Sequence, residues 1–294
     1  MIVDCHTHIW PGPNDLGEAS GFGCLCCEAD MPAGPEQHRS ACQEADFVLV
    51  LGFVCSRLDA AIPNAYLSEY VSQHRQRMVA FAGVDPTEPG SAEQVDEIAE
   101  NTAFGGLTVA PGCQGFHPCD SRAMVIYEKA QAAGMPIYFL QGDRLPASAQ
   151  MAHQQPMHYD EVAQSFPDLK IVISHMGCPW MDQMVALLAK HEHVYTDIAG
   201  LTTRPWQAYR ALIMAYEYGV IEKLLFASDF PNNSVKDAVE AVYNLNKLTL
   251  DSVLPAIPRE QLRGIVERES LSLLGLTPPA LPQAGDTEDQ KAAG

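Results

Sequence analysis

Two histidines near the start of the chain, His6 and His8, are well placed to bind a metal ion. They follow the short apolar run of residues 1–3, and residues that alternate along a β-strand point to the same side of it. Both imidazoles are therefore expected on one face of the first strand. If this strand lines a closed barrel, the two imidazoles near its C-terminal end could hold a metal ion together.

Further candidate ligands stand at the ends of later apolar runs, namely His175, Asp197 and Asp229. Zinc accepts a mixture of imidazole nitrogen and carboxylate oxygen, so these residue types predict a site for zinc or another divalent metal. We interpret Asp197 as structural and take His6, His8, His175 and Asp229 as the metal ligands. Two alternatives stay open: His175 could be a buried imidazole bonded to the backbone, and Asp229 could cap the helix that follows it.

A fold that brings these residues together must gather the ends of several strands. Apolar runs typical of strands buried on both faces alternate with helical stretches along the chain. This alternation favours a parallel sheet, and eight such units favour closure, so we predict an α/β protein with a single (β/α)8 TIM barrel. The predicted strands cover residues 2–8, 46–52, 78–84, 104–109, 136–140, 169–174, 193–197 and 223–229. The predicted helices cover residues 36–44, 63–75, 91–101, 121–133, 157–166, 179–190, 205–218, 237–243 and 259–274.

The composition of the 294 residues narrows the class of protein further. The chain has 18 Lys and Arg against 37 Asp and Glu, and its formal net charge of −19 repels nucleic acids and anionic membranes. No apolar run approaches the length that crosses a bilayer, and the N-terminus lacks a signal-peptide pattern. We expect a cytoplasmic protein whose partner is a small-molecule substrate. The barrel is expected over residues 1–276, and residues 277–294, rich in Pro, Ala and acidic residues, are predicted to be a disordered tail.

The nine cysteines are an odd number in a chain too long to need disulfides, so reduced thiols are expected. A thiolate near the barrel mouth could bind a metal ion. The alternative is that each cysteine is a small buried hydrophobic residue. The predicted strands place seven of them on the mouth side, namely Cys24, Cys26, Cys27, Cys55, Cys113, Cys119 and Cys178.

Several motifs together resemble a known family. They are Asp4-x-His6-x-His8, Ser174-His-Met-Gly-Cys-Pro-Trp180 and Ala227-Ser-Asp-Phe-Pro231, and the similarity extends over residues 1–276. These motifs are similar to those of the metal-dependent amidohydrolase superfamily, in particular of its branch that includes the aminocarboxymuconate semialdehyde decarboxylase-like enzymes. The resemblance implies that His6 and His8 bind the metal, that Asp229 binds it or acts as a base, and that His175 lies beside it.

The chain departs from the family pattern at two positions that the resemblance would place inside the barrel. A histidine is expected at the end of the fifth strand, where this chain has Leu140, and many relatives have a lysine where this chain has Thr108. Gln141 or Asp143 could supply the missing metal ligand from the loop after the fifth strand. A thiolate is the other candidate, and Cys24, Cys26 and Cys27 form a cluster of thiols after the first strand.

The function implied by the resemblance is metal-dependent hydrolysis or decarboxylation of a small carboxylate-bearing or cyclic substrate, with zinc as the expected ion. Asp229 would accept a proton from the attacking water, and His175 would stabilise the developing oxyanion or donate a proton. The alternative is a catalytically altered or metal-free barrel that binds a small ligand, which the absence of the fifth-strand histidine and of the fourth-strand lysine favours. Relatives often dimerise, so a homodimer is also an expectation.

Overall fold

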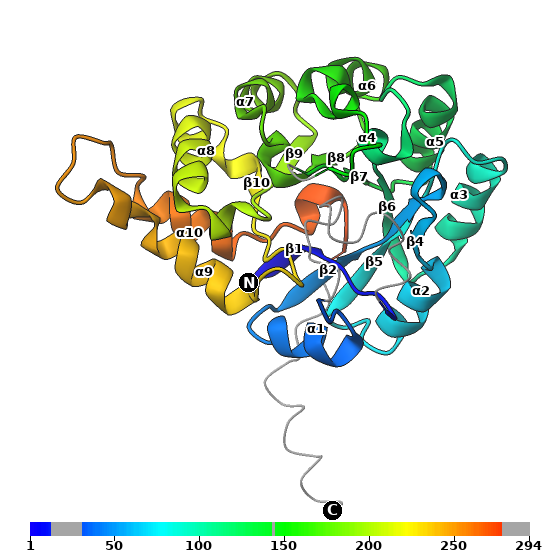
Figure 1. Cartoon of the computed structure of the whole chain (residues 1–294), viewed down its shortest axis with the longest axis horizontal. Coiled ribbons are helices and arrows are strands. Elements are labelled where there is room, and N and C mark those ends of the chain that lie inside the picture. Colours follow the sequence, from blue (N-terminus) through cyan, green and yellow to red (C-terminus); the bar gives the residue numbers. More distant parts are fainter. Residues whose placement is uncertain (13–30, 143–144, 278–294) are drawn as a thin grey trace, which may run out of the picture.

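The computed structural model describes residues 1–12, 31–142 and 145–277 and contains an eight-stranded sheet (Figure 1). In sheet order the strands are β1 (Val3–Thr7), β2 (Phe47–Leu51), β5 (Met78–Gly83), β6 (Phe104–Val109), β7 (Ile137–Phe139), β8 (Ile171–Ile173), β9 (Val194–Asp197) and β10 (Leu224–Leu225). Adjacent strands pair in parallel, as β2 and β5 do from Val48 opposite Met78 to Leu51 opposite Phe81. All eight predicted strands are confirmed.

The last strand returns to the first and brings the barrel close to closure. The N–H of Cys5 donates to the carbonyl of Phe226 at 2.9 Å, and the N–H of His8 donates to the carbonyl of Phe230 at 2.9 Å. A parallel bridge also joins Thr7 to Phe230. A single (β/α)8 barrel is therefore confirmed, and its closing seam lies beside the two N-terminal histidines.

Helices surround the barrel and connect its strands (Figure 1). Two of them have N-cap side chains. The Asp120 carboxylate accepts the N–H of Arg122 at 3.0 Å, and the Ser234 hydroxyl accepts the N–H of Asp237 at 3.1 Å. The α-helices are α1 (Pro35–Ala41), α2 (Asn64–Ser72), α3 (Ser91–Glu100), α4 (Pro111–Gln114), α5 (Ser121–Ala132), α6 (Tyr159–Ser165), α7 (Met181–Lys190), α8 (Pro205–Glu217), α9 (Val235–Asn244) and α10 (Arg259–Glu267).

The single predicted helix over residues 259–274 is wrong, because the chain leaves the helix after Glu267. A short 3-10 turn, η9 (Ser272–Leu274), follows instead. The Glu269 carboxylate accepts the N–H of Leu271 at 2.8 Å. In a continuous helix, this N–H would instead donate to a backbone carbonyl one turn earlier.

An antiparallel hairpin, which the sequence analysis did not predict, follows β2. Its strands are β3 (Phe53–Cys55) and β4 (Ala60–Ile62), and Asp59 turns the chain with a φ of 47°. Three residues are too few to show an alternation of apolar and polar side chains, so the pattern gives no sign of this hairpin.

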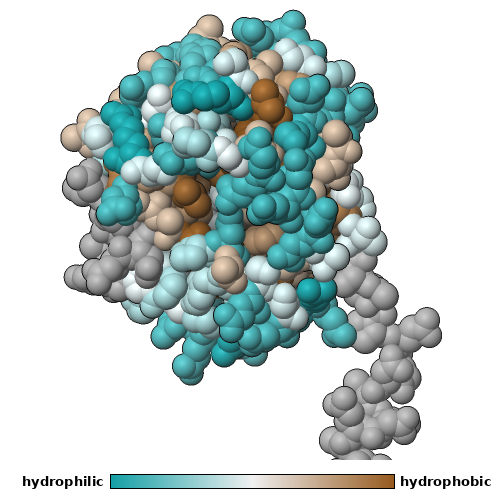
Figure 2. All heavy atoms as spheres, turned by 90° about the vertical axis from the view of Figure 1, so that its right-hand side faces the viewer, coloured by the Kyte–Doolittle hydropathy of each residue, from teal (hydrophilic) through white to brown (hydrophobic). Residues whose placement is uncertain are grey.

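The barrel strands supply the core, as their apolar sequences predict. Every residue of β2 is buried, and so is every residue of β1 and of β9. Figure 2 shows that the face on the α2 and α3 side of the molecule is mostly hydrophilic, with isolated hydrophobic residues. In the described parts of the chain, no helix has the length and apolar character that crossing a membrane requires.

Strand β1 is fixed on its outer side by a directional chain of hydrogen bonds. The Tyr70 hydroxyl donates to Nδ1 of His38 at 2.8 Å, and Nε2 of His38 donates to the Thr7 hydroxyl at 2.9 Å. Thr7 in turn donates to the carbonyl of Leu49 at 2.8 Å. His38 is fully buried and must be neutral to accept from Tyr70, so helix α1 is tied to β1 through an uncharged imidazole.

Burial, with smaller contributions from Arg39 and His74, lowers the pKa of His38 from 6.5 to about 3. The unfolded chain therefore takes up this proton before the folded chain does. Stability should fall as the pH drops from 6.5 towards 3, by about 1.4 kcal/mol per pH unit for this single group. We expect the His38→Gln variant to lose part of this slope. Urea unfolding at several pH values from 7 to 4 measures the slope, with His117→Gln as the control, and an unchanged slope in His38→Gln would contradict the expectation.

Candidate metal centre

The fold brings the four predicted ligands together at the C-terminal ends of three strands. His6 lies on β1 and His8 directly after it, His175 follows β8, and Asp229 follows β10. One ligand atom each from His6, His175 and Asp229 lies within 4.8 Å of the others, and all three residues are buried. Nε2 of His8 lies 3.0 Å from Nε2 of His6, so the two imidazoles share one side of the strand as predicted. What role each residue plays remains a prediction.

The other ring nitrogen of each histidine donates to an oxygen acceptor. Nδ1 of His6 donates to Asp197 Oδ2, Nδ1 of His8 to the carbonyl of Leu51, and Nδ1 of His175 to the carbonyl of Ala199, each at 2.8 Å. An acceptor at Nδ1 fixes the proton there in the neutral ring. The basic lone pair of all three imidazoles is thereby assigned to Nε2, which is the arrangement that metal-binding histidines require.

This assignment leaves the Nε2 lone pairs of His6 and His8 facing each other across 3.0 Å. Two facing lone pairs repel each other unless a cation lies beside them. Protonation of His8 would remove this repulsion but is unfavourable, because burial and the neighbouring His6 lower the pKa of His8 well below its usual value. A divalent cation at Nε2 removes the repulsion, and the donor set therefore fits a metal ion.

Asp229 adds a carboxylate to the same space. Its Oδ2 accepts from the side-chain amide of Asn232 at 3.0 Å, whereas its Oδ1 is buried with no hydrogen-bond partner and lies 3.9 Å from Nε2 of His6. Burial raises the pKa of Asp229, and the neighbouring His175 and His6 oppose that shift. An unpartnered buried carboxylate oxygen is costly, and a metal ion or a transferable proton would satisfy it.

Asp197 joins His6, His175 and Tyr138 through its carboxylate, and its structural role stays a prediction. Its Oδ2 accepts from His6 and from the Tyr138 hydroxyl, and its Oδ1 accepts the backbone N–H of His175 at 2.7 Å and that of Ala199 at 2.9 Å. Burial alone would raise the pKa of Asp197, but His6 and the other donors outweigh it and lower that pKa to about 2. One ionised carboxylate thus positions two candidate ligands.

The backbone around the site adopts conformations that most residues avoid. His175 has a φ of 54° and Asp229 a φ of 70°, and each such residue costs about 1–3 kcal/mol. Gly200, with a φ of 68°, lies so close that a Cβ there would approach His175 Nδ1 at 3.2 Å and Asp229 Oδ2 at 3.4 Å. A side chain at position 200 would therefore press on both candidate reactive groups.

The two positions that depart from the family pattern carry no metal ligand. Leu140 is buried, and the Thr108 hydroxyl donates to the carbonyl of Gly52 at 2.7 Å. Gln141, the proposed replacement ligand, has a free acceptor atom. Its side-chain nitrogen donates to the carbonyl of Ser174 at 3.3 Å, and its Oε1 is buried without a hydrogen-bond partner. The sequence analysis missed Tyr138, which lies on β7 two residues before Leu140. Alternation along the predicted strand 136–140 would have placed both side chains on the same side.

The described cysteines do not complete the site. The group of described residues with metal-ligand geometry contains no thiol. Cys55, Cys119 and Cys178 are not in disulfides, but Cys113 is disulfide-bonded, so the expectation of reduced thiols is wrong for that residue. A disulfide depends on which sulfurs the fold brings together, and chain length and cysteine count do not determine that. The other candidate ligands after strands one and five, which are Cys24, Cys26, Cys27 and Asp143, lie outside the described residues.

We expect the Asp197→Asn variant to bind metal about 10- to 100-fold more weakly, because His6 loses the anionic acceptor that orients it. Its free energy of unfolding should also fall by about 1–3 kcal/mol, since an amide cannot accept all four hydrogen bonds. Metal titration and urea unfolding measure the two effects. Tyr138→Phe is the matched control, because it removes one donor to Asp197 and leaves the carboxylate, and it should retain metal affinity. Equal affinities in Asp197→Asn and the wild type would contradict this account of Asp197.

Comparison with solved structures shows the same barrel in other proteins. An uncharacterised TIM-barrel protein from Bordetella bronchiseptica is 18% identical, with 93% of this chain and 98% of that chain covered and a TM-score of 0.71. A probable 2-pyrone-4,6-dicarboxylic acid hydrolase from Acinetobacter baumannii, with citric acid bound, is 15% identical, with coverage of 94% and 99% and a TM-score of 0.66. A 5-carboxyvanillate decarboxylase from Novosphingobium aromaticivorans, complexed with manganese, is 14% identical, with coverage of 94% and 96% and a TM-score of 0.64.

At these identities the solved structures establish the fold and leave the activity open. No curated protein matches the sequence. The family model described as amidohydrolase, in contrast, matches residues 3–276, which includes every described strand and every candidate ligand. The chain therefore belongs to the amidohydrolase family.

Proposed function

We propose that this protein is a metal-dependent hydrolase or decarboxylase that acts on a small cyclic or aromatic carboxylate. The observation that carries the proposal is the 3.0 Å approach of two imidazole Nε2 atoms whose Nδ1 atoms both donate elsewhere. Family membership supports the reaction class. The names of the structural neighbours support the substrate class, since they include a dicarboxylic acid hydrolase and decarboxylases of carboxyvanillate and dihydroxybenzoate.

The metal would be held by His6, His8, His175 and Asp229, and a divalent ion supplies Lewis-acid activation in such a site. Zinc suits the nitrogen-rich donor set. Manganese is the alternative, because the Novosphingobium decarboxylase contains it. The experiment below distinguishes the two ions.

The protein's own groups then divide the proton transfers between them. Asp229 is suited to accept a proton, because its Oδ1 lacks a partner and burial raises its pKa towards the range of a useful base. His175 is suited to accept a proton at Nε2, because its own proton is fixed at Nδ1 on the carbonyl of Ala199. Once protonated there, its Nε2–H would donate a proton to the substrate or stabilise a developing oxyanion. Gln141 would orient the substrate, since its buried Oε1 can accept a hydrogen bond from a hydroxyl group.

The rival function is a metal-free barrel that binds a small ligand, and Leu140 at the fifth-strand position favours it. Elemental analysis separates the two. We expect about one divalent ion per chain after growth in medium with both zinc and manganese, and loss of at least nine-tenths of it in a His6→Ala, His8→Ala double variant. The His38→Gln variant, which changes a buried histidine outside the cluster, should keep its metal. Metal-free wild-type protein under these conditions would defeat the proposal.

The catalytic roles are tested with His175→Gln. We expect kcat to fall by about 10²- to 10⁴-fold, the range typical of a lost general acid or base, with more than half of the metal retained by the other three ligands. The substrates to screen are 2-pyrone-4,6-dicarboxylate, 5-carboxyvanillate and 2,6-dihydroxybenzoate, with CO₂ release and absorbance of the ring as readouts. His158→Gln is the control. A loss below tenfold in His175→Gln would remove His175 from the mechanism.

Two further properties stay predictions from the sequence and the family resemblance. They are a cytoplasmic location and a homodimer, which fractionation of cells and analytical ultracentrifugation would test.

A further inference from the structure

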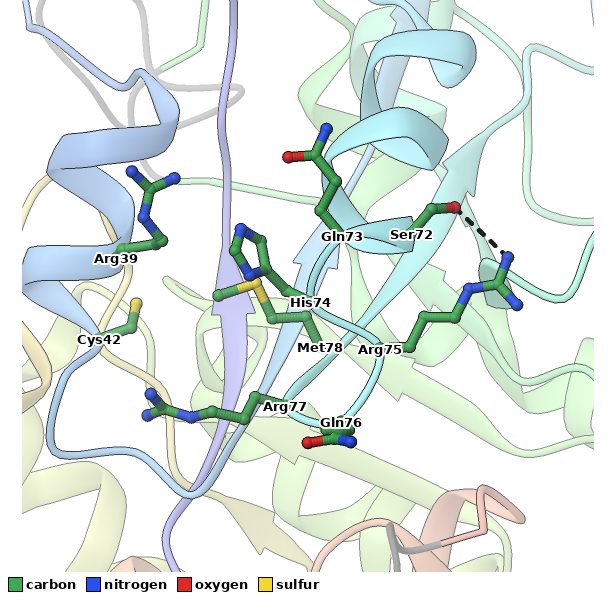
Figure 3. A pocket seen from close by; sticks show the side chains of 9 residues that line it. All are labelled: Arg39, Cys42, Ser72, Gln73, His74, Arg75, Gln76, Arg77 and Met78. Carbon is green, nitrogen blue, oxygen red and sulfur yellow. Dashed lines mark hydrogen bonds between the residues drawn. The ribbon is translucent and has the colours of Figure 1, made fainter. Parts of the chain in front are cut away.

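A cavity of about 540 Å³ opens at the end of the barrel opposite the candidate metal centre. It lies between the end of α1 and the segment that leads into β5, at the N-terminal ends of the strands (Figure 3). Its size is within the range of small-molecule sites. The lining residues are Arg39, Cys42, Ser72, Gln73, His74, Arg75, Gln76, Arg77 and Met78.

This lining is basic in a protein that is strongly acidic overall. It contains three arginines and a histidine and no carboxylate, although the chain carries 37 Asp and Glu against 18 Lys and Arg. Other arginines pair with acidic side chains, as Arg122 does with Asp120 and Arg263 with Glu267. Between the residues that the structure describes, no ion pair includes Arg39, Arg75 or Arg77.

Burial and two arginines of the lining lower the pKa of the neighbouring His74. In Figure 3, Arg39 and Arg77 lie on either side of Cys42 and His74 lies across the cavity from α1, whereas Arg75 points the other way, toward Ser72. Burial lowers the pKa of His74, and the charges of Arg39 and Arg77 lower it further. Two carboxylates act on the lining from behind it: burial raises the pKa of Cys42, Asp4 and then Glu44 raise it further, and Arg77 lowers it. The Cys42 thiol also donates to Asp4 Oδ2 at 4.0 Å. The lining itself contains no carboxylate.

One of the arginines is held in place before any ligand arrives. The Arg77 guanidinium donates to the carbonyl of Ala45 at 2.5 Å and to that of Gln43 at 3.3 Å. Both bonds use the same terminal nitrogen, so the remaining N–H groups of the fork can still donate. A guanidinium fixed in this way loses little entropy when it binds an oxyanion.

We propose that this basic cavity binds a small oxyanion with at least two negative charges, a phosphate or a polycarboxylate, through Arg39, His74 and Arg77. Two guanidinium forks suit paired oxygen atoms, which both kinds of anion present. The cavity is separated from the candidate metal centre by the length of the barrel strands, so this ligand is distinct from a substrate at the mouth. The inference does not depend on the proposed function.

The test is isothermal titration of the purified, metal-containing protein with inorganic phosphate and, separately, with tricarballylate, at matched ionic strength. We expect saturable binding of one anion per chain, weakened at least tenfold in Arg39→Gln. Arg210→Gln, which removes an equal charge from an exposed position on α8, should bind like the wild type. Saturation by phosphate alone identifies a phosphate site, and saturation by tricarballylate alone identifies a polycarboxylate site.

Arg77→Lys provides a second variant that keeps the charge but loses the fork, and it should also weaken binding at least tenfold. Circular dichroism of each variant verifies that it is folded. The proposal is overturned if neither anion saturates the wild-type protein, or if Arg39→Gln and Arg77→Lys bind as tightly as the wild type does.

Discussion

The organisation of the candidate site depends on one buried carboxylate, that of Asp197. It accepts four hydrogen bonds, from two side chains and two backbone N–H groups, and so joins β1, β7, β9 and the segment after β8 at one point. An ionised group that is fully buried would be costly without such partners. Two of these four partners, the His6 imidazole and the backbone N–H of His175, belong to candidate ligands. The bonds that stabilise the buried charge therefore also position the site.

The barrel distributes its charges along its axis. At the C-terminal ends of the strands, the buried carboxylates of Asp197 and Asp229 surround imidazoles whose lone pairs point inward, which favours a cation. At the opposite end, arginines gather around a cavity without a carboxylate, which favours an anion. Parallel strands make this division possible, because every strand presents its beginning at one end of the barrel and its finish at the other.

Much of this structure could be predicted from the sequence, because its signals are local. The apolar runs identify all eight barrel strands, and a polar residue at the end of a run, such as His175 or Asp229, identifies a candidate ligand. The parts that could not be predicted depend on contacts between distant segments. The bond from Tyr138 to Asp197 spans 59 positions, and the carbonyl of Leu51 that orients His8 carries no side-chain signature.

The positive φ angles of His175 and Asp229 have a consequence for how this barrel would evolve. Glycine adopts such backbone more readily than histidine or aspartate does. Mutation of either residue to glycine would relieve backbone strain in the candidate site and so stabilise the fold. A descendant no longer selected for its chemistry would therefore be expected to lose its reactive groups first and to keep its barrel long afterwards.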